Sequence, residues 1–137
     1  MLPKKPSLSI IGLGYVGLPL ALEFGKITAT TGFDTNTDRI EELRGAHDRT
    51  LESSADEFKA ATYLSFTHNT HDIEHSDVYI VTVPTPIDSS CQPDLSFLEE
   101  ASRLLGQVVS NGNVIIFEST VFPGCTEENC IPIIAWG

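Results

Sequence analysis

The feature that most constrains this chain is a glycine-rich turn placed directly behind a short apolar segment. Gly12, Gly14 and Gly17 form the pattern G-x-G-x-x-G immediately after residues 8–11, which are strand-like. Where a strand turns into a helix, the first glycine permits a tight turn, the second lets a pyrophosphate approach the backbone, and the third allows close helix packing. Unpaired N–H groups at the start of the helix favour an anion. The pattern therefore predicts a dinucleotide site, with a glycine-rich turn of an unrelated α/β domain as the minor alternative.

A single acidic residue indicates which dinucleotide this site would take. Asp34 follows Gly12 by 22 residues and ends a second strand-like segment, residues 31–34. A carboxylate at this position accepts hydrogen bonds from the hydroxyl groups of the adenosine ribose and repels a 2′-phosphate. The sequence therefore predicts NAD rather than NADP as the cofactor.

Length, composition and charge exclude several other classes of protein. The 137 residues correspond to one domain, and no segment approaches the roughly 20 apolar residues that a membrane-spanning helix needs. Lys4 and Lys5 precede an apolar segment, but glycines interrupt it and no fitting cleavage site follows, so no signal peptide is predicted. A net charge of −11 with only 8 Lys and Arg residues argues against a nucleic-acid partner.

The cysteines and histidines form no pattern that predicts a metal site. Cys125 and Cys130 are too far apart for a C-x-x-C pair, and His71 and His75 have no further ligands evident. An odd number of cysteines, 3 in all, without a secretion signal favours a reducing compartment. We therefore expect a cytoplasmic protein with no bound metal and no membrane association.

Strand-like and helix-like segments alternate along the chain. After residue 34, the sequence predicts a helix over residues 37–44 capped by Thr37, a short helix near 55–61 and a strand over 63–67. A polar turn or helix over 71–76 and a buried strand over 77–83 follow. The last two elements are a helix that begins with a Ser96/Glu99 capping box and a buried strand over 114–117. The buried face of the last helix is predicted to consist of Leu95, Leu98, Ala101, Leu105 and Val108. Strands joined through helices form parallel sheets with helices on both faces. The predicted fold class is therefore α/β, a Rossmann-type doubly wound parallel sheet.

Ligands of such sheets collect at the carboxyl ends of the strands. Segments that follow predicted strands are residues 12–17, Asp34, residues 84–86 and residues 119–120. We expect these separated segments to meet at one edge of the sheet.

Motifs in a fixed order extend over nearly the whole chain. They are Ile11-Gly12-Leu13-Gly14-Tyr15-Val16-Gly17-Leu18-Pro19-Leu20, Gly32-Phe33-Asp34 with Arg39-Ile40, Val83-Pro84-Thr85-Pro86, Pro93-Asp94, and Glu118-Ser119-Thr120-Val121 with Pro123-Gly124. Together they resemble the N-terminal NAD-binding domain of the UDP-glucose/GDP-mannose dehydrogenase family. Within that family, residues 48–52 and 84–88 most resemble the branch that oxidises UDP-N-acetylhexosamines, such as UDP-N-acetylglucosamine or UDP-N-acetylgalactosamine 6-dehydrogenases.

The resemblance implies a role for individual residues. The pyrophosphate would be held by Gly12, Gly14, Tyr15, Val16 and Gly17. Asp34 would bind the adenosine ribose, and Arg39 would lie near the adenosine. Thr85 would line the dinucleotide cleft. Thr120 would approach the nicotinamide and the reacting carbon, where the family uses a threonine hydroxyl to help order water or the substrate oxygen.

Each of these implied roles has a plainer alternative. From the sequence alone, Arg39 would be interpreted as an exposed arginine on a helix. Thr85 lies between prolines, where a turn threonine needs no function, and Thr120 could simply satisfy the backbone at a strand end.

The resemblance also implies an activity and marks what this chain lacks. Family members oxidise the C6 alcohol of a nucleotide sugar to a carboxylate, a four-electron reaction that uses two NAD molecules, in the synthesis of polysaccharide precursors. Their substrate-binding and dimerisation regions, with the catalytic cysteine and lysine, lie in later segments. The resemblance therefore gives no nucleophilic role to Cys91, Cys125 or Cys130.

For this reason we expect residues 1–137 to form an NAD-binding domain whose chain ends before the sixth strand of a complete dinucleotide fold. We expect it to bind NAD weakly and to be inactive alone, while the full-length protein acts on a UDP-sugar and forms a homo-oligomer. Two alternatives stay open: a free-standing NAD-binding module without catalysis, and the cofactor domain of a dehydrogenase for another hydroxy substrate. Residues 84–86 and 118–121 argue against the second, although a shared fold does not exclude it.

Overall fold

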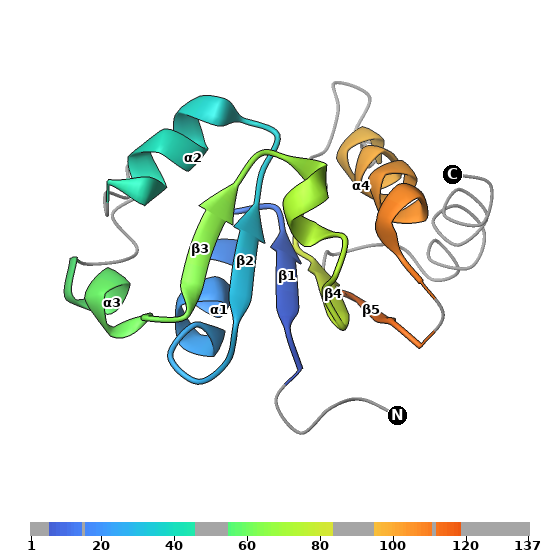
Figure 1. Cartoon of the computed structure of the whole chain (residues 1–137). Coiled ribbons are helices and arrows are strands. Elements are labelled where there is room, and N and C mark those ends of the chain that lie inside the picture. Colours follow the sequence, from blue (N-terminus) through green and yellow to red (C-terminus); the bar gives the residue numbers. More distant parts are fainter. Residues whose placement is uncertain (1–5, 15, 46–54, 84–94, 111, 119–137) are drawn as a thin grey trace.

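The computed structural model describes residues 6–14, 16–45, 55–83, 95–110 and 112–118 of the chain. Its elements, in chain order, are β1 (Leu8–Ile11), α1 (Gly17–Phe24), β2 (Thr30–Phe33), α2 (Thr37–Arg44), α3 (Ala55–Ala60), β3 (Leu64–Thr67), the 3₁₀ turn η1 (Thr70–Ile73), β4 (Val78–Val81), α4 (Ser96–Val108) and β5 (Val114–Phe117). The alternation of strands and helices confirms the predicted α/β class (Figure 1).

The described strands form one parallel sheet in the order β3-β2-β1-β4-β5 (Figure 1). β1 is the third of the five strands in this order, and its Ile11 is paired with Phe33 of β2 on one side and with Val81 of β4 on the other. The chain runs outward from β1 to β3 and then returns to place β4 beside β1. Sheets of this kind bind ligands where the strand order reverses, at the carboxyl ends of the strands. The predicted doubly wound parallel sheet is confirmed.

Helices cover both faces of this sheet. Successive side chains of a strand point to opposite faces, so Ile10 packs in the core under α1, α2 and α3, whereas Ile11 packs in the core under α4 and η1. β4 is buried along its whole length, as predicted. Burial raises the pKa of Tyr79 on β4, whose hydroxyl donates to the Ile73 carbonyl oxygen at 2.5 Å. The two cores fix the sheet from both sides and hold its carboxyl edge in place.

The N-terminal caps predicted for α2 and α4 are both wrong. α2 is capped by Asn36, whose side-chain oxygen accepts a hydrogen bond from the Arg39 backbone N–H at 3.2 Å, so Thr37 is already helical. In α4 the cap position belongs to Leu95, which makes no side-chain capping hydrogen bond, and Ser96 lies inside the helix. Asn, Thr and Ser all suit the cap position, so their presence near a helix start does not choose among neighbouring residues.

The strand predicted over residues 114–117 is confirmed as β5, but the prediction that it is buried is wrong. Among the described strands, β5 lies at the edge of the sheet beside β4. Val114 and Ile116 are each 38% exposed, while Ile115 and Phe117 pack against the core under α4. A short apolar run of β-branched residues suits edge and interior strands alike, so its hydrophobicity does not fix its place in the sheet.

Candidate functional site

The glycine turn joins β1 to α1 at the carboxyl edge of the sheet. Gly12 has a φ of 98°, which glycine adopts readily and other residues rarely do. Its N–H donates to the Phe33 carbonyl oxygen of β2 at 2.8 Å. Gly17 starts α1 so close to the turn that a Cβ atom on it would lie 1.7 Å from the Gly12 carbonyl oxygen. The Thr82 hydroxyl, just after β4, donates to that same oxygen at 2.6 Å, so both neighbouring strands hold the turn.

Gly14 has surroundings unlike those of the other two glycines. A Cβ atom built on Gly14 has no atom within 4 Å, and the residue is exposed. α1 begins directly after Val16, whose side chain makes no capping hydrogen bond to the first turn of the helix. Open space beside a helix start without a side-chain cap is the arrangement that an anionic phosphate group needs.

The Asp34 carboxylate lies just after β2 and binds the glycine turn directly. Its Oδ2 accepts a hydrogen bond from the Leu13 N–H at 3.0 Å, and its Oδ1 accepts one from the Asn36 N–H at 3.0 Å. A carboxylate oxygen has two lone pairs, so each oxygen keeps one acceptor position after making its backbone hydrogen bond. Asp34 can therefore accept two further hydrogen bonds without giving up its place in the fold.

Arg39 is buried, which overturns its interpretation as an exposed helix arginine. It is 7% exposed, and its Nε donates to the Leu13 carbonyl oxygen at 2.8 Å. Its Nη1 lies 2.9 Å from Oε1 of Glu42 in a largely buried ion pair. Asp34 and Arg39 thus hold opposite ends of residue Leu13, through its N–H and its carbonyl oxygen.

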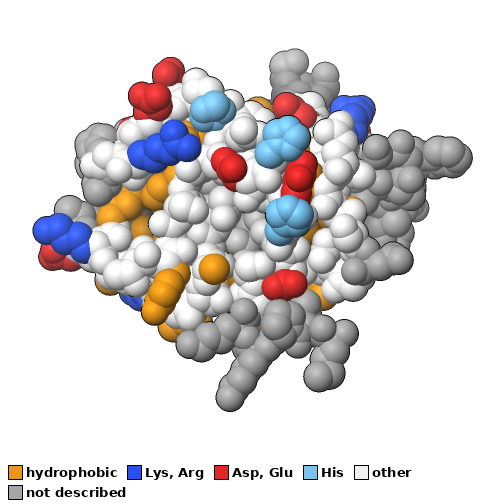
Figure 2. All heavy atoms as spheres, in the orientation of Figure 1, with side chains coloured by type: hydrophobic (Ala, Val, Ile, Leu, Met, Phe, Trp, Pro, Cys, Tyr) orange, Lys and Arg blue, Asp and Glu red, His pale blue; other side chains and the backbone are white. Residues whose placement is uncertain are grey.

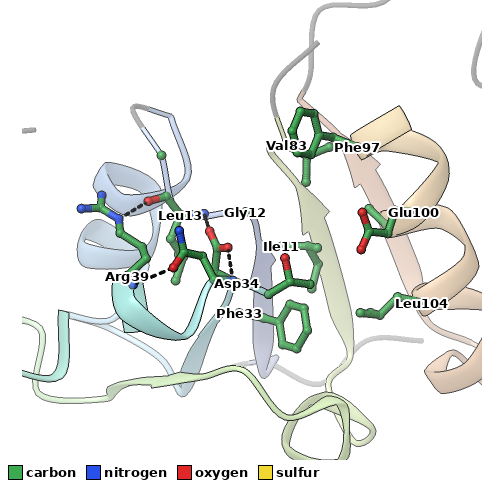
Figure 3. A pocket seen from close by; sticks show the side chains of 14 residues that line it. Ile11, Gly12, Leu13, Phe33, Asp34, Arg39, Val83, Phe97, Glu100 and Leu104 are labelled. Carbon is green, nitrogen blue, oxygen red and sulfur yellow. Dashed lines mark hydrogen bonds between the residues drawn. The ribbon is translucent and has the colours of Figure 1, made fainter. Parts of the chain in front are cut away.

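One pocket of about 360 Å³, a size usual for small-molecule sites, is lined by Gly12, Leu13, Gly14, Asp34 and Arg39 together with residues of α4. Figure 3 shows Asp34 and Arg39 on one side of it, with β1 between them and α4. The opposite side is formed by α4, which contributes Phe97, Glu100 and Leu104 (Figure 3). The pocket therefore connects segments that are far apart in the sequence at the predicted edge of the sheet.

The predicted site residues fall into three groups. Four line this pocket: Gly12, Gly14, Asp34 and Arg39. Two are described but do not line it: Val16 and Gly17. Three lie outside the described residues: Tyr15, Thr85 and Thr120. The part that each plays toward a cofactor stays a prediction.

The contribution of α4 to the pocket was not predicted from the sequence. Only the buried face of this helix was predicted, and that face is confirmed for Leu98, Ala101, Leu105 and Val108. The pocket is lined by Phe97, Glu100, Ala101 and Leu104, a neighbouring stripe whose members recur three or four residues apart. That spacing was a signal, but a stripe beside a core face occurs on most amphipathic helices and does not by itself indicate a ligand.

The described histidines, His68, His71 and His75, do not line this pocket. Histidine and acidic side chains gather on the face shown in Figure 2, and His71 Nδ1 lies 2.8 Å from Glu74 Oε1. η1 ends at Ile73, so His71 and His75 do not share a helix. Within the described ranges, no group of three or more histidine, cysteine or acidic side chains is arranged to hold a metal ion. No helix in those ranges is long and apolar enough to cross a membrane.

This chain matches one known protein family over nearly its whole length. Residues 6–136 match the NAD-binding domain of the UDP-glucose/GDP-mannose dehydrogenase family. A UDP-N-acetyl-D-glucosamine 6-dehydrogenase of Pseudomonas aeruginosa is 53% identical over 131 residues, which cover 96% of this chain and 31% of that protein. One of Salmonella typhi is 52% identical over 128 residues, covering 93% and 30% respectively. This chain thus spans a little under a third of the length of these relatives.

Solved structures share the same fold. A UDP-D-ManNAc dehydrogenase from Pyrococcus horikoshii superposes with a TM-score of 0.86 at 31% identity, covering 93% of this chain and 31% of that one. A GDP-mannose dehydrogenase from Pseudomonas aeruginosa, solved as a ternary complex, gives a TM-score of 0.86 at 26% identity with the same coverage. The fold of this chain is therefore shared with these two dehydrogenases.

Proposed function

Because this chain belongs to the UDP-glucose/GDP-mannose dehydrogenase family and forms its NAD-binding domain, we propose that it is part of an enzyme that oxidises the C6 alcohol of a UDP-N-acetylhexosamine to the carboxylate. The two relatives named UDP-N-acetyl-D-glucosamine 6-dehydrogenase support this class of substrate. The activity would supply precursors for polysaccharide synthesis. We further propose that the whole protein is cytoplasmic and homo-oligomeric, as the family resemblance implies.

The observation that carries the proposal is that Gly14 and Asp34 line the same pocket. The free acceptor positions of the Asp34 carboxylate suit the two hydroxyls of the adenosine ribose. The open space at Gly14, beside the start of α1, suits the pyrophosphate. The residues present therefore fit NAD, with Asp34 binding the ribose and the turn around Gly14 binding the pyrophosphate.

The remaining roles concern the reacting end of the cofactor. Bound NAD supplies a hydride acceptor, and oxidation of an alcohol to a carboxylate removes four electrons, so each sugar consumes two NAD molecules. The residues of this chain bind and orient the cofactor. We propose that Tyr15, Val16 and Gly17 complete the pyrophosphate site, that Thr85 lines the cleft, and that Thr120 contacts the nicotinamide and the reacting carbon.

Replacing Asp34 with asparagine is expected to weaken NAD binding ten- to hundredfold and to reduce the preference for NAD over NADP. Hydrogen bonds to a charged group contribute about 1.5 to 3 kcal/mol, and the amide loses the charge together with half of the acceptor positions. It also no longer repels a 2′-phosphate. Isothermal titration calorimetry with NAD and NADP gives both dissociation constants.

The matched control for this substitution is Asp38→Asn. Asp38 is an exposed carboxylate in the first turn of α2 and does not line the pocket. The control is expected to keep the dissociation constants of the unmodified chain. An Asp34→Asn variant that retains the full preference for NAD would contradict the role proposed for Asp34.

We expect the 137-residue chain to bind NAD but to oxidise no sugar nucleotide unaided. The family resemblance places the nucleophile on none of Cys91, Cys125 and Cys130, which lie outside the described residues. The test measures NADH formation at 340 nm with NAD and either UDP-N-acetylglucosamine or UDP-N-acetylgalactosamine. The full-length Pseudomonas aeruginosa relative is the positive control. Calorimetric NAD binding in the same sample shows that the chain is folded, and turnover by this chain would overturn the expectation.

A further inference from the structure

The side of the pocket that faces Asp34 has no role in the function proposed above. We call it the α4 wall, and its members are Phe97, Glu100, Ala101 and Leu104. Their spacing places them along one stripe of the helix, which is apolar except for the carboxylate of Glu100. In Figure 3 this carboxylate points away from α4, toward the side of the pocket where Ile11 and Asp34 lie.

Glu100 is exposed, so its carboxylate is accessible to a ligand in the pocket. Within the described part of the chain, no hydrogen bond or ion pair involves its carboxylate, whereas neighbouring Glu99 lies 4.0 Å from the Arg103 guanidinium. Glu100 therefore brings a second carboxylate to a pocket that already contains Asp34. Two carboxylates repel an anionic dinucleotide unless each accepts a hydrogen bond from a donor on that ligand.

The adenosine half of NAD offers two kinds of hydrogen-bond donor. They are the ribose hydroxyls and the exocyclic amino group of the base. The hydroxyls are already matched by Asp34 in the proposed function, so the amino group remains for Glu100. The apolar members of the α4 wall offer a surface for the flat face of a base, and Phe97, which is 46% exposed, is an aromatic side chain that a base would cover.

We propose that the α4 wall receives the adenine ring and that the Glu100 carboxylate accepts a hydrogen bond from its exocyclic amino group. Glu100 is then a residue that determines specificity for adenine over other purines. This inference rests on the proposed function, because it takes NAD to lie in this pocket with its ribose on Asp34.

The test compares NAD with nicotinamide hypoxanthine dinucleotide, in which a carbonyl oxygen replaces the amino group of adenine. We expect the unmodified chain to bind NAD about tenfold more tightly. The carbonyl oxygen cannot donate the charge-assisted hydrogen bond that the amino group donates, and it repels the carboxylate. In the Glu100→Gln variant the amide can rotate to accept from an amino group or donate to a carbonyl. We expect that variant to bind the two dinucleotides within about threefold of each other. Calorimetric titration of each chain with each dinucleotide gives the ratio.

Glu99→Gln is the matched control, because it makes the same change one residue earlier on α4, beside Arg103 and outside the pocket lining. It is expected to keep the tenfold preference. Equal affinities for both dinucleotides in the unmodified chain, or an unchanged preference in Glu100→Gln, would overturn the role of Glu100 while leaving the NAD site intact. Failure of the unmodified chain to bind NAD at all would overturn the cofactor site and this inference together.

Discussion

Replacing Gly17 with alanine is expected to lower the free energy of unfolding by about 3 kcal/mol, at the upper end of usual overpacking effects. The added Cβ atom would lie 1.7 Å from the Gly12 carbonyl oxygen and 2.5 Å from the Thr82 Oγ1 atom. The helix propensity of alanine returns only about 1 kcal/mol. The clash involves backbone rather than the end of a flexible side chain, so relief requires α1 to move away from the turn. Thermal unfolding followed by circular dichroism is expected to show a Tm lower by roughly 10 °C.

Gly45→Ala is the control for this substitution. Gly45 ends α2 with a φ of −82°, and a Cβ atom there meets its nearest neighbour, the Glu42 carbonyl oxygen, at an ordinary contact distance of 3.4 Å. The same chemical change is therefore expected to shift Tm by no more than about 2 °C. Equal stability of the Gly17→Ala and Gly45→Ala variants would contradict the close approach of α1 to the turn.

Replacing Gly14 with valine is expected to weaken NAD binding while leaving the fold stable, unlike the substitution at Gly17. A side chain on Gly14 enters open space, with no atom within 4 Å of its Cβ position. That space is where we propose that the pyrophosphate lies, so the valine side chain excludes it from the backbone N–H groups of the turn. We expect the dissociation constant for NAD to rise tenfold or more, which corresponds to about 1.4 kcal/mol. Calorimetric titration measures the affinity, and thermal unfolding of the same sample measures the stability.

The Gly45→Ala variant again serves as the control, since it lies away from the pocket and should bind NAD normally. A smaller loss of affinity is expected for Gly14→Ala, because its side chain fills less of the open space. A Gly14→Val variant that folds and binds NAD as the unmodified chain does would place the cofactor elsewhere. Measured together, the variants at Gly14 and Gly17 separate the binding function of the glycine motif from its packing function.

Most of the fold was predictable because its signals are local. The apolar run that forms β4 and the glycine motif between β1 and α1 each indicate an element from residues close in sequence. The predicted N-cap of α2 was wrong because Asn36 and Thr37 suit the same position equally well, and only the course of the backbone after β2 selects Asn36. The burial predicted for β5 was wrong because edge and interior strands have similar compositions.

The candidate site was predictable only on the side that carries the motif. Gly14 and Asp34 belong to a spacing with a known physical basis, whereas Glu100 enters the pocket through the packing of α4 against β1 and β4. The burial of Arg39 likewise depends on the Leu13 carbonyl oxygen, which is 26 residues away in the sequence. Contacts between distant segments of this kind leave no pattern in a single sequence.

The two hydrogen bonds that hold Leu13 bear on any attempt to change cofactor preference by design. The carboxylate proposed to bind the ribose also anchors, through the Leu13 N–H, the turn proposed to bind the pyrophosphate. Energies of substitutions at Asp34 and in the turn therefore should not add, because residues within one hydrogen-bond network are coupled. Conversion to NADP by exchanging Asp34 alone would weaken phosphate binding at the same time as it admits the 2′-phosphate. A successful redesign must provide another acceptor for the Leu13 N–H, so the unit to be exchanged is the turn together with the end of β2.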